Sequence, residues 1–180
     1  MTFAVRPAIA DDAGAIAEIH YAGWQVAYAD IITTEDMASR LPERRVAFWQ
    51  ERIADLGDLV LIAEDERGAA QGFMHGGRVL EHDIRAGSLD GYDCEIYSLH
   101  CRQRVHGQGL GRLLMAETAR VFRERGCRAL TLWAFRDNSY RVFYERNGGT
   151  LIAEGFDGDI PDVAYGWPVV ALAGSQTGAA

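Results

Sequence analysis

Hydrophobic residues along the chain follow two spacings, and turn residues separate the segments. Apolar runs that alternate with polar residues, or that are short and bounded by turn residues, are typical of strands. They predict strands over residues 2–6, 59–63, 71–76, 94–101, 129–134, 150–154 and 164–170. Asp65 to Gly68 supplies turn chemistry between the second and third of these, so we expect a hairpin there.

Apolar residues at helical spacing predict the helices. The first helix follows Asp11 and Asp12, either of which can cap it, and others cover residues 43–54, 110–126 and 139–146. The expected inward faces are Ile16, Ile19, Gly23 and Val26 in the first helix, Val46, Trp49 and Ile53 in the second, and Leu110, Leu113, Leu114, Val121 and Phe122 in the third.

Strands and helices are mixed along the chain, with a central hairpin and one strand, glycine loop and helix unit. This order predicts an α/β or α+β domain in three layers. No internal repeat and no linker is visible, so we expect a single domain over residues 1–170. Residues 171–180 predict a disordered C-terminal tail, and residues 80–92 a turn-rich connection.

Composition and charge exclude several classes of protein. Hydrophobic residues make up 48% of the 180 residues, which is enough for a substantial core. The 26 acidic residues against 18 basic ones give a net charge of −8, which disfavours nucleic acid or an anionic membrane as a partner. The N-terminal residues lack a secretion signal, so we expect a cytoplasmic protein. Cys94, Cys101 and Cys127 have no metal-ligand spacing, so we expect reduced thiols and no metal.

The most informative segment is the basic, glycine-rich stretch 102–112 between a predicted strand and a predicted helix. Glycines at 107, 109 and 111 let a ligand approach main-chain N–H groups closely. Together with the first turn of the helix, these groups can cradle a pyrophosphate, and Arg104 and Arg112 add positive charge. The alternative is a turn that only links strand to helix. The segment lacks the lysine of a P-loop and the spacing of a dinucleotide-binding fold.

His106-Gly107-Gln108-Gly109-Leu110-Gly111 resembles the Q/R-x-x-G-x-G/A signature of the GNAT superfamily of acetyl-coenzyme A-dependent N-acyltransferases, with His106 where the family usually has Gln or Arg. A second register, residues 104–109, matches the pattern literally but lies two residues early relative to the strand. Asn138 and the segment 143–149 are similar to the family's N…FYEKxGF pattern, with Gly149 replacing the usual aromatic residue. Residues 24–28 with Arg44, Arg45 and Trp49 are similar to a bacterial branch, so the resemblance spans residues 3–170.

The resemblance implies a fold, a co-substrate and a set of site residues. The fold would be a central mixed, mostly antiparallel sheet flanked by helices, and the co-substrate acetyl-CoA, without a metal. The implied coenzyme contacts are Leu99, His100, Cys101, His106, Gly107, Gln108, Gly109, Leu110, Gly111, Arg112 and Asn138. Asn138 would hydrogen-bond the pantetheine arm or brace the strands.

Two residues would carry the proton transfers. Tyr144 would protonate the leaving thiolate, its alternative being a packing residue. Glu95 would be the general base, its alternative being an exposed carboxylate at a strand end, with His75 and His100 as competitors. His100 and Cys101 point to opposite faces of a strand, which favours direct transfer over a covalent cysteine intermediate.

The implied reaction is N-acetylation of a primary amine on a small molecule or peptide. Trp24, Tyr28, Trp49 and residues 31–41 would wall the acceptor site, although Trp49 fits the core equally well. An amino acid, a polyamine, an aminoglycoside or a protein N-terminus remain open as acceptors. The alternative function is a non-catalytic acyl-CoA-binding sensor or interaction module, which would need no proton donor at Tyr144. The assembly state is open, with a homodimer as one possibility.

Overall fold

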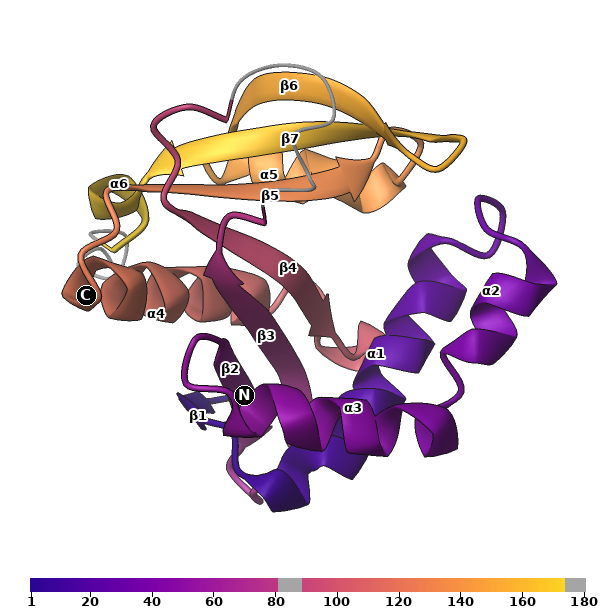
Figure 1. The fold of residues 1–180 in the computed structure, drawn as a ribbon. Helices are drawn as coiled ribbons and strands as arrows, with labels where there is room; N and C mark the ends of the chain where they lie inside the picture. Colours follow the sequence, from indigo (N-terminus) through magenta and orange to yellow (C-terminus); the bar gives the residue numbers. More distant parts are fainter. Residues whose placement is uncertain (81–88, 174–180) are drawn as a thin grey trace. The chain divides into compact units, whose positions relative to one another are not determined.

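The computed structural model describes residues 1–80 and 89–173, and the chain divides into two compact units (Figure 1). The first unit comprises Met1–Gly76 and Ser98–Leu114, and the second comprises Gly77–Tyr97 and Met115–Ala180. The predictions for residues 81–88 and 174–180 lie outside the described residues.

Most elements belong to one unit, whereas β3, β4 and α4 contribute to both. The elements of the first unit are β1 (Phe3–Pro7), the 3-10 turn η1 (Ala10–Asp12), α1 (Ala13–Ala27), α2 (Thr34–Ser39), α3 (Pro42–Ala54), β2 (Leu59–Asp65), β3 (Ala70–Arg78), the end of β4 (Cys94–Cys101), the 3-10 turn η3 (Gln103–Val105) and the start of α4 (Leu110–Glu124). Those of the second are the end of β3, the start of β4, the rest of α4, β5 (Ala129–Phe135), the 3-10 turn η4 (Ser139–Arg141), α5 (Val142–Arg146), β6 (Thr150–Asp157), β7 (Ile160–Pro168) and α6 (Val169–Ala173).

The strands form a seven-stranded sheet in the order β1-β2-β3-β4-β5-β7-β6. In the first unit β1 pairs with β2, and β2 with β3, both antiparallel. In the second unit β4 pairs in parallel with β5, while β7 lies antiparallel to both β5 and β6. The predicted mixed, mostly antiparallel sheet flanked by helices is therefore confirmed, as is the hairpin of β2 and β3.

The core of the first unit lies between the β2–β3 hairpin and the helices α1 and α3. Apolar residues at helical spacing on α1 and α3 meet alternate residues of the strands, which removes one stripe of each helix from water. The buried residues of this core are Ala13, Ile16, Ala17, Ile19, Trp49, Val60, Ile62 and Phe73. Trp49 is 1% exposed, whereas Val26, predicted to face inward, is 42% exposed at the end of α1.

The beginnings and ends of the main helices follow local rules. Pro42 occupies the first position of α3, where its missing N–H costs no hydrogen bond. After α4, Gly126 has a φ of +89°, and the Cys127 N–H donates to the Phe122 carbonyl at 2.9 Å. The helix therefore ends where the glycine allows the chain to turn into β5. None of the helices within residues 1–80 and 89–173 is long and apolar enough to cross a membrane.

The C-terminal part of the second unit differs from the prediction. Strand β7 starts at Ile160 and ends at Pro168, whereas the sequence predicted a strand over residues 164–170. The sequence pattern missed the start of the strand because Pro161 and Asp162 are not typical of a strand interior. Residues 169–173 form α6.

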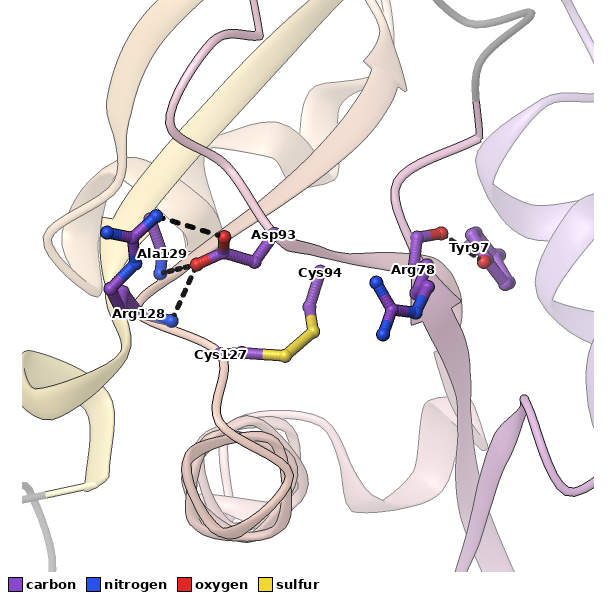
Figure 2. The surroundings of a disulfide bond; sticks show 7 residues. All are labelled: Arg78, Asp93, Cys94, Tyr97, Cys127, Arg128 and Ala129. Carbon is purple, nitrogen blue, oxygen red and sulfur yellow. Dashed lines mark hydrogen bonds and ion pairs between the residues drawn. A yellow bond between two sulfur atoms is a disulfide. The ribbon is translucent and has the colours of Figure 1, made fainter.

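Cys94 and Cys127 form a disulfide, so the prediction of reduced thiols is wrong for these two residues (Figure 2). Their Cα atoms lie 6.2 Å apart, within the usual range for such a bond. The preceding Asp93 carboxylate accepts hydrogen bonds from the Arg128 N–H at 2.8 Å and the Ala129 N–H at 3.4 Å. These contacts hold the start of β4 beside the start of β5, and Cys101 is left as a free thiol.

Candidate active site

The glycine loop before α4 presents main-chain donors at the N-terminus of a 15-residue helix. Gly107 and Gly109 have φ values of +74° and +85°, and a Cβ added at either would meet no atom within 4 Å. The N–H groups of Gly107, Gly109, Gly111 and Arg112 form no hydrogen bond with any described residue. Such free donors, together with the positive end of the helix dipole, suit a phosphate group.

Side chains of the loop fasten it to the strands of the first unit. The Arg104 Nε donates to the Gln71 Oε1 at 3.0 Å, and the Gln108 side chain donates to the Arg104 carbonyl at 3.1 Å. The His106 Nε2 lies 3.0 Å from the Cys101 carbonyl oxygen, which can only accept, so that nitrogen carries the proton. The loop conformation is therefore held in place before any ligand binds.

The end of β4 carries the predicted residues Leu99, His100 and Cys101. Burial raises the pKa of Cys101 to about 12, so its thiol stays protonated near neutral pH. A protonated thiol is a weak nucleophile, which agrees with direct transfer. A Cβ at Gly72 of β3 would lie 3.0 Å from the Cys101 Sγ and 3.0 Å from the His100 carbonyl, so the glycine lets the two strands approach closely.

A cluster of histidine and aromatic rings surrounds His100 in the first unit. The His20 ring lies 5.1 Å from that of His100 and 5.3 Å from that of Trp49, both edge to face. Phe73 stacks on His100 with ring centroids 5.7 Å apart. Burial lowers the pKa of His100 to about 4, and burial followed by the nearby His100 lowers the pKa of His20 well below its usual value. Both rings are therefore neutral near pH 7.

His75 also contacts this ring cluster, since its ring centroid lies 5.5 Å from that of Trp49. Its Nε2 is 2.9 Å from the Asp58 Oδ2, which favours the charged ring. Burial has the larger effect, so the pKa of His75 is lowered overall. His75 is thus a neutral histidine held by a carboxylate.

The second unit holds Glu95, Asn138 and Tyr144. Glu95 is only 3% exposed, and the Leu80 N–H lies 3.4 Å from its Oε2, so the alternative of an exposed strand-end carboxylate is wrong. The buried Asn138 caps η4, its Oδ1 accepting from the Tyr140 N–H at 2.9 Å. Tyr144, on α5, is half-buried, so its packing is incomplete on one side.

Trp167 explains the glycine at position 149. A Cβ at Gly149 would lie 2.5 Å from the Trp167 Cζ2 and 2.9 Å from the Tyr144 carbonyl oxygen. The Trp167 Nε1 donates to the Asn147 carbonyl at 3.0 Å, which holds the indole there. The aromatic side chain expected at position 149 is thus absent because a ring from β7 fills its space.

The predicted site residues fall in both units. Leu99 to Cys101 and the loop residues His106 to Arg112 belong to the first unit, and Glu95, Asn138 and Tyr144 to the second. Sequence reasoning missed His20, because a lone histidine within a helical pattern gives no signal until the fold surrounds it with other rings.

Residues 24–148 match the model of the acetyltransferase (GNAT) family. The chain belongs to the GNAT family. It is 27% identical over 168 residues to the uncharacterized N-acetyltransferase YuaI of Bacillus subtilis, covering 91% of this chain and 92% of that protein. The family assigns this GNAT chain to the acyltransferases.

Solved structures share the GNAT fold of this chain. The PaiA N-acetyltransferase of Thermoplasma acidophilum, in complex with coenzyme A, has a TM-score of 0.71 at 18% identity, covering 93% of this chain and all of that one. YncA of Salmonella typhimurium, solved with its cofactor acetyl-CoA, has a TM-score of 0.64 at 22% identity, covering 94% and 95% of the two chains.

Proposed function

We propose that this GNAT protein transfers the acetyl group of acetyl-CoA directly to a primary amine of a small molecule or peptide. The observation that carries the proposal is the loop from His106 to Arg112, whose free N–H groups stand at the N-terminus of α4. A pyrophosphate supplies the acceptors that these donors lack.

The end of β4 suits the pantetheine arm of the coenzyme. Its peptide-like amides can pair with exposed backbone groups as an added strand does, along Leu99, His100 and Cys101. Asn138 is a further candidate contact, although its Oδ1 already serves the turn at η4. Bound acetyl-CoA would supply the thioester; the protein residues position it and move protons.

The transfer forms a C–N bond and breaks a C–S bond. The neutral amine attacks the thioester carbonyl carbon, and the amine proton passes to Glu95 directly or through water. The thiolate of coenzyme A leaves and takes the hydroxyl proton of Tyr144, so protons balance over the two steps. Both roles stand on the family resemblance and on the residue types.

Glu95 is favoured over the histidines as the base. A pKa of about 4 makes His100 a weak acceptor of a proton near neutral pH. His75 also has a lowered pKa, and its Nε2 is already bonded to Asp58. Glu95, whose side chain is buried, keeps the role of base that the family resemblance gives it.

The loop is tested with acetyl-CoA as a stabilising ligand, because a ligand that binds only the folded state raises the unfolding temperature. Gly109→Leu places a side chain on the phosphate cradle and should abolish the shift. Gly68→Leu is the matched control, since Gly68 has a similar φ of +76° in the β2–β3 turn, far along the chain from the loop. A full shift in Gly109→Leu would contradict the loop assignment.

The acid is tested by Tyr144→Phe, which keeps the ring and removes the hydroxyl proton. We expect coenzyme release with an amine panel to fall by about 10²–10⁴-fold, with little change in acetyl-CoA affinity. Tyr140→Phe, at a tyrosine that is 40% exposed on η4, is the control. Turnover of Tyr144→Phe within a few-fold of the parent would remove Tyr144 as the acid. Coenzyme binding without thiol release from any amine would favour an acyl-CoA sensor.

A further inference from the structure

Three polar atoms at the junction of α1 and α3 have no hydrogen-bond partner. They are the Nδ1 of His20, the Nε1 of Trp49 and the Nε of Arg45, all shielded from water. The Trp49 and Arg45 atoms can only donate, and the neutral His20 ring can donate from Nδ1 in one tautomer. A buried donor without an acceptor is unfavourable, because it has given up its hydrogen bond to water and gained none in return. Together the three donors would suit a ligand that supplies hydrogen-bond acceptors.

The three atoms belong to one cluster. The rings of His20 and Trp49 lie 5.3 Å apart. Arg45 and Trp49 are four residues apart on α3 and share one face of the helix. The pKa of His20 is lowered mainly by burial, then by His100 and then by the charge of Arg45. The Arg45 charge therefore lies near the His20 ring.

The positive charge of Arg45 has no anionic partner among the described residues. Its guanidinium lies 3.7 Å from the Phe48 ring centroid and forms no hydrogen bond or ion pair with the described residues. Burial and the charge of Arg40 both lower the pKa of Arg45, so the two cations lie close enough to repel. The Asp58 carboxylate is already engaged, at 2.9 Å from His75 and 3.3 Å from Arg52.

We propose that Arg45, with His20 and Trp49, binds the carboxylate of the acceptor, so that the amine substrate is an amino acid or a similar carboxylate-bearing amine. This rests on the proposed function and names its substrate class. A carboxylate offers lone pairs to several donors at once, and its pairing with a guanidinium is among the stronger hydrogen bonds in proteins. The same anion would offset the repulsion between Arg40 and Arg45.

The cluster adjoins the strand on which we place the acyl arm. The His20 ring lies 5.1 Å from that of His100, and the carbonyl of the next residue, Cys101, accepts the hydrogen bond from His106 of the glycine loop. All four residues belong to the first unit. A carboxylate held at Arg45 therefore brings the acceptor to the end of β4.

The same charges disfavour two of the acceptors left open by the sequence. A polyamine or an aminoglycoside carries several positive charges and few strong acceptors, so Arg40 and Arg45 would repel it. The Arg40 guanidinium lies 3.6 Å from the Trp24 ring centroid, which keeps this charge at the wall of the proposed site.

The first test compares matched amines. L-methionine, L-phenylalanine and L-glutamate are each offered with acetyl-CoA beside the corresponding α-carboxamide and decarboxylated amine. We expect at least one acid to be acetylated, with kcat/KM roughly 100-fold above its amide. Arg45→Gln should raise KM for that acid by roughly 30-fold or more, with a smaller change in kcat. The control is Arg44→Gln, which makes the same charge change at an exposed neighbour on α3. Equal rates for acids and amides would overturn the inference and leave acetyl transfer intact.

The second test does not depend on turnover. The unfolding temperature is measured with the N-acetylated acids and with their amides, in the absence of coenzyme. The parent and Arg44→Gln should be stabilised by the acids alone, and Arg45→Gln by neither series. No difference between acids and amides, or an unchanged response in Arg45→Gln, would refute the carboxylate site. If acetyl-CoA in a separate measurement does not raise the unfolding temperature of the parent, the proposed function is refuted instead.

Discussion

His100, the partly buried histidine of β4, should make the protein sensitive to mild acid. His100 has an ordinary pKa of 6.5 when exposed and about 4 in the folded protein, because burial disfavours its charged form. Between these values the unfolded chain binds a proton that the folded protein does not. Stability from this residue is therefore fully present above the unfolded pKa and is lost as the pH falls toward the folded pKa.

The size of the effect follows from the two pKa values. A difference from 6.5 to about 4 corresponds to about 3 kcal/mol in total, of which about 2 kcal/mol is lost between pH 7 and pH 5. The carboxylates whose pKa values are lowered, such as Asp12, lose their contribution at lower pH. The window between pH 7 and pH 5 therefore isolates the histidines.

The assay is urea unfolding at pH 7, 6 and 5 of the parent and of His100→Asn and His100→Gln, which do not titrate. Both variants should lose about 2 kcal/mol less than the parent over this range, with His20 and His75 supplying the remaining slope. Nuclear magnetic resonance of the imidazole protons follows His100 directly. If the variants keep the full pH dependence, or if His100 protonates near pH 6.5, the reasoning is refuted. His100 would then return as a candidate general base.

Three further changes test the second unit. Reduction of the Cys94–Cys127 disulfide should lower the free energy of unfolding by about 3–4 kcal/mol, since the bond spans 33 residues. An unchanged urea midpoint in the presence of dithiothreitol would contradict this. Gly149→Ala should destabilise by about 1–3 kcal/mol because its Cβ would clash with Trp167 and with the Tyr144 carbonyl oxygen. Trp167→Leu in the same chain should relieve only the part of that cost that is due to the ring. Asn138→Ala should cost about 1 kcal/mol through the lost cap at η4. If Asn138→Ala instead lowers the affinity for acetyl-CoA without lowering the stability, the main role of Asn138 is to contact the coenzyme and not to cap η4.

Local patterns in the sequence determined most elements and the family. The hairpin of β2 and β3, the strand β4 and the helix α4 were predicted because each depends on neighbouring residues: spacing of apolar positions, turn residues at 65–68, and glycines that end or open an element. The glycine loop carried the family resemblance for the same reason, since its conformation and its free N–H groups are properties of a short continuous segment.

Only the tertiary structure decided features that join distant residues. The disulfide depends on the parallel pairing of β4 with β5, which brings Cys94 opposite Leu130 and so near Cys127. The absent aromatic residue at 149 depends on Trp167 from another strand.

The histidine cluster and its unpartnered donors depend on the same kind of long-range packing. His20 lies on α1, Arg45 on α3 and His100 on β4, and nothing in the sequence near any of them marks the others. Burial sets their pKa values and leaves hydrogen-bond donors without acceptors, and burial is a property of the assembled fold. Sequence patterns alone therefore led to the proposed coenzyme site at the glycine loop, whereas the proposed carboxylate site emerged only when α1, α3 and β4 came together.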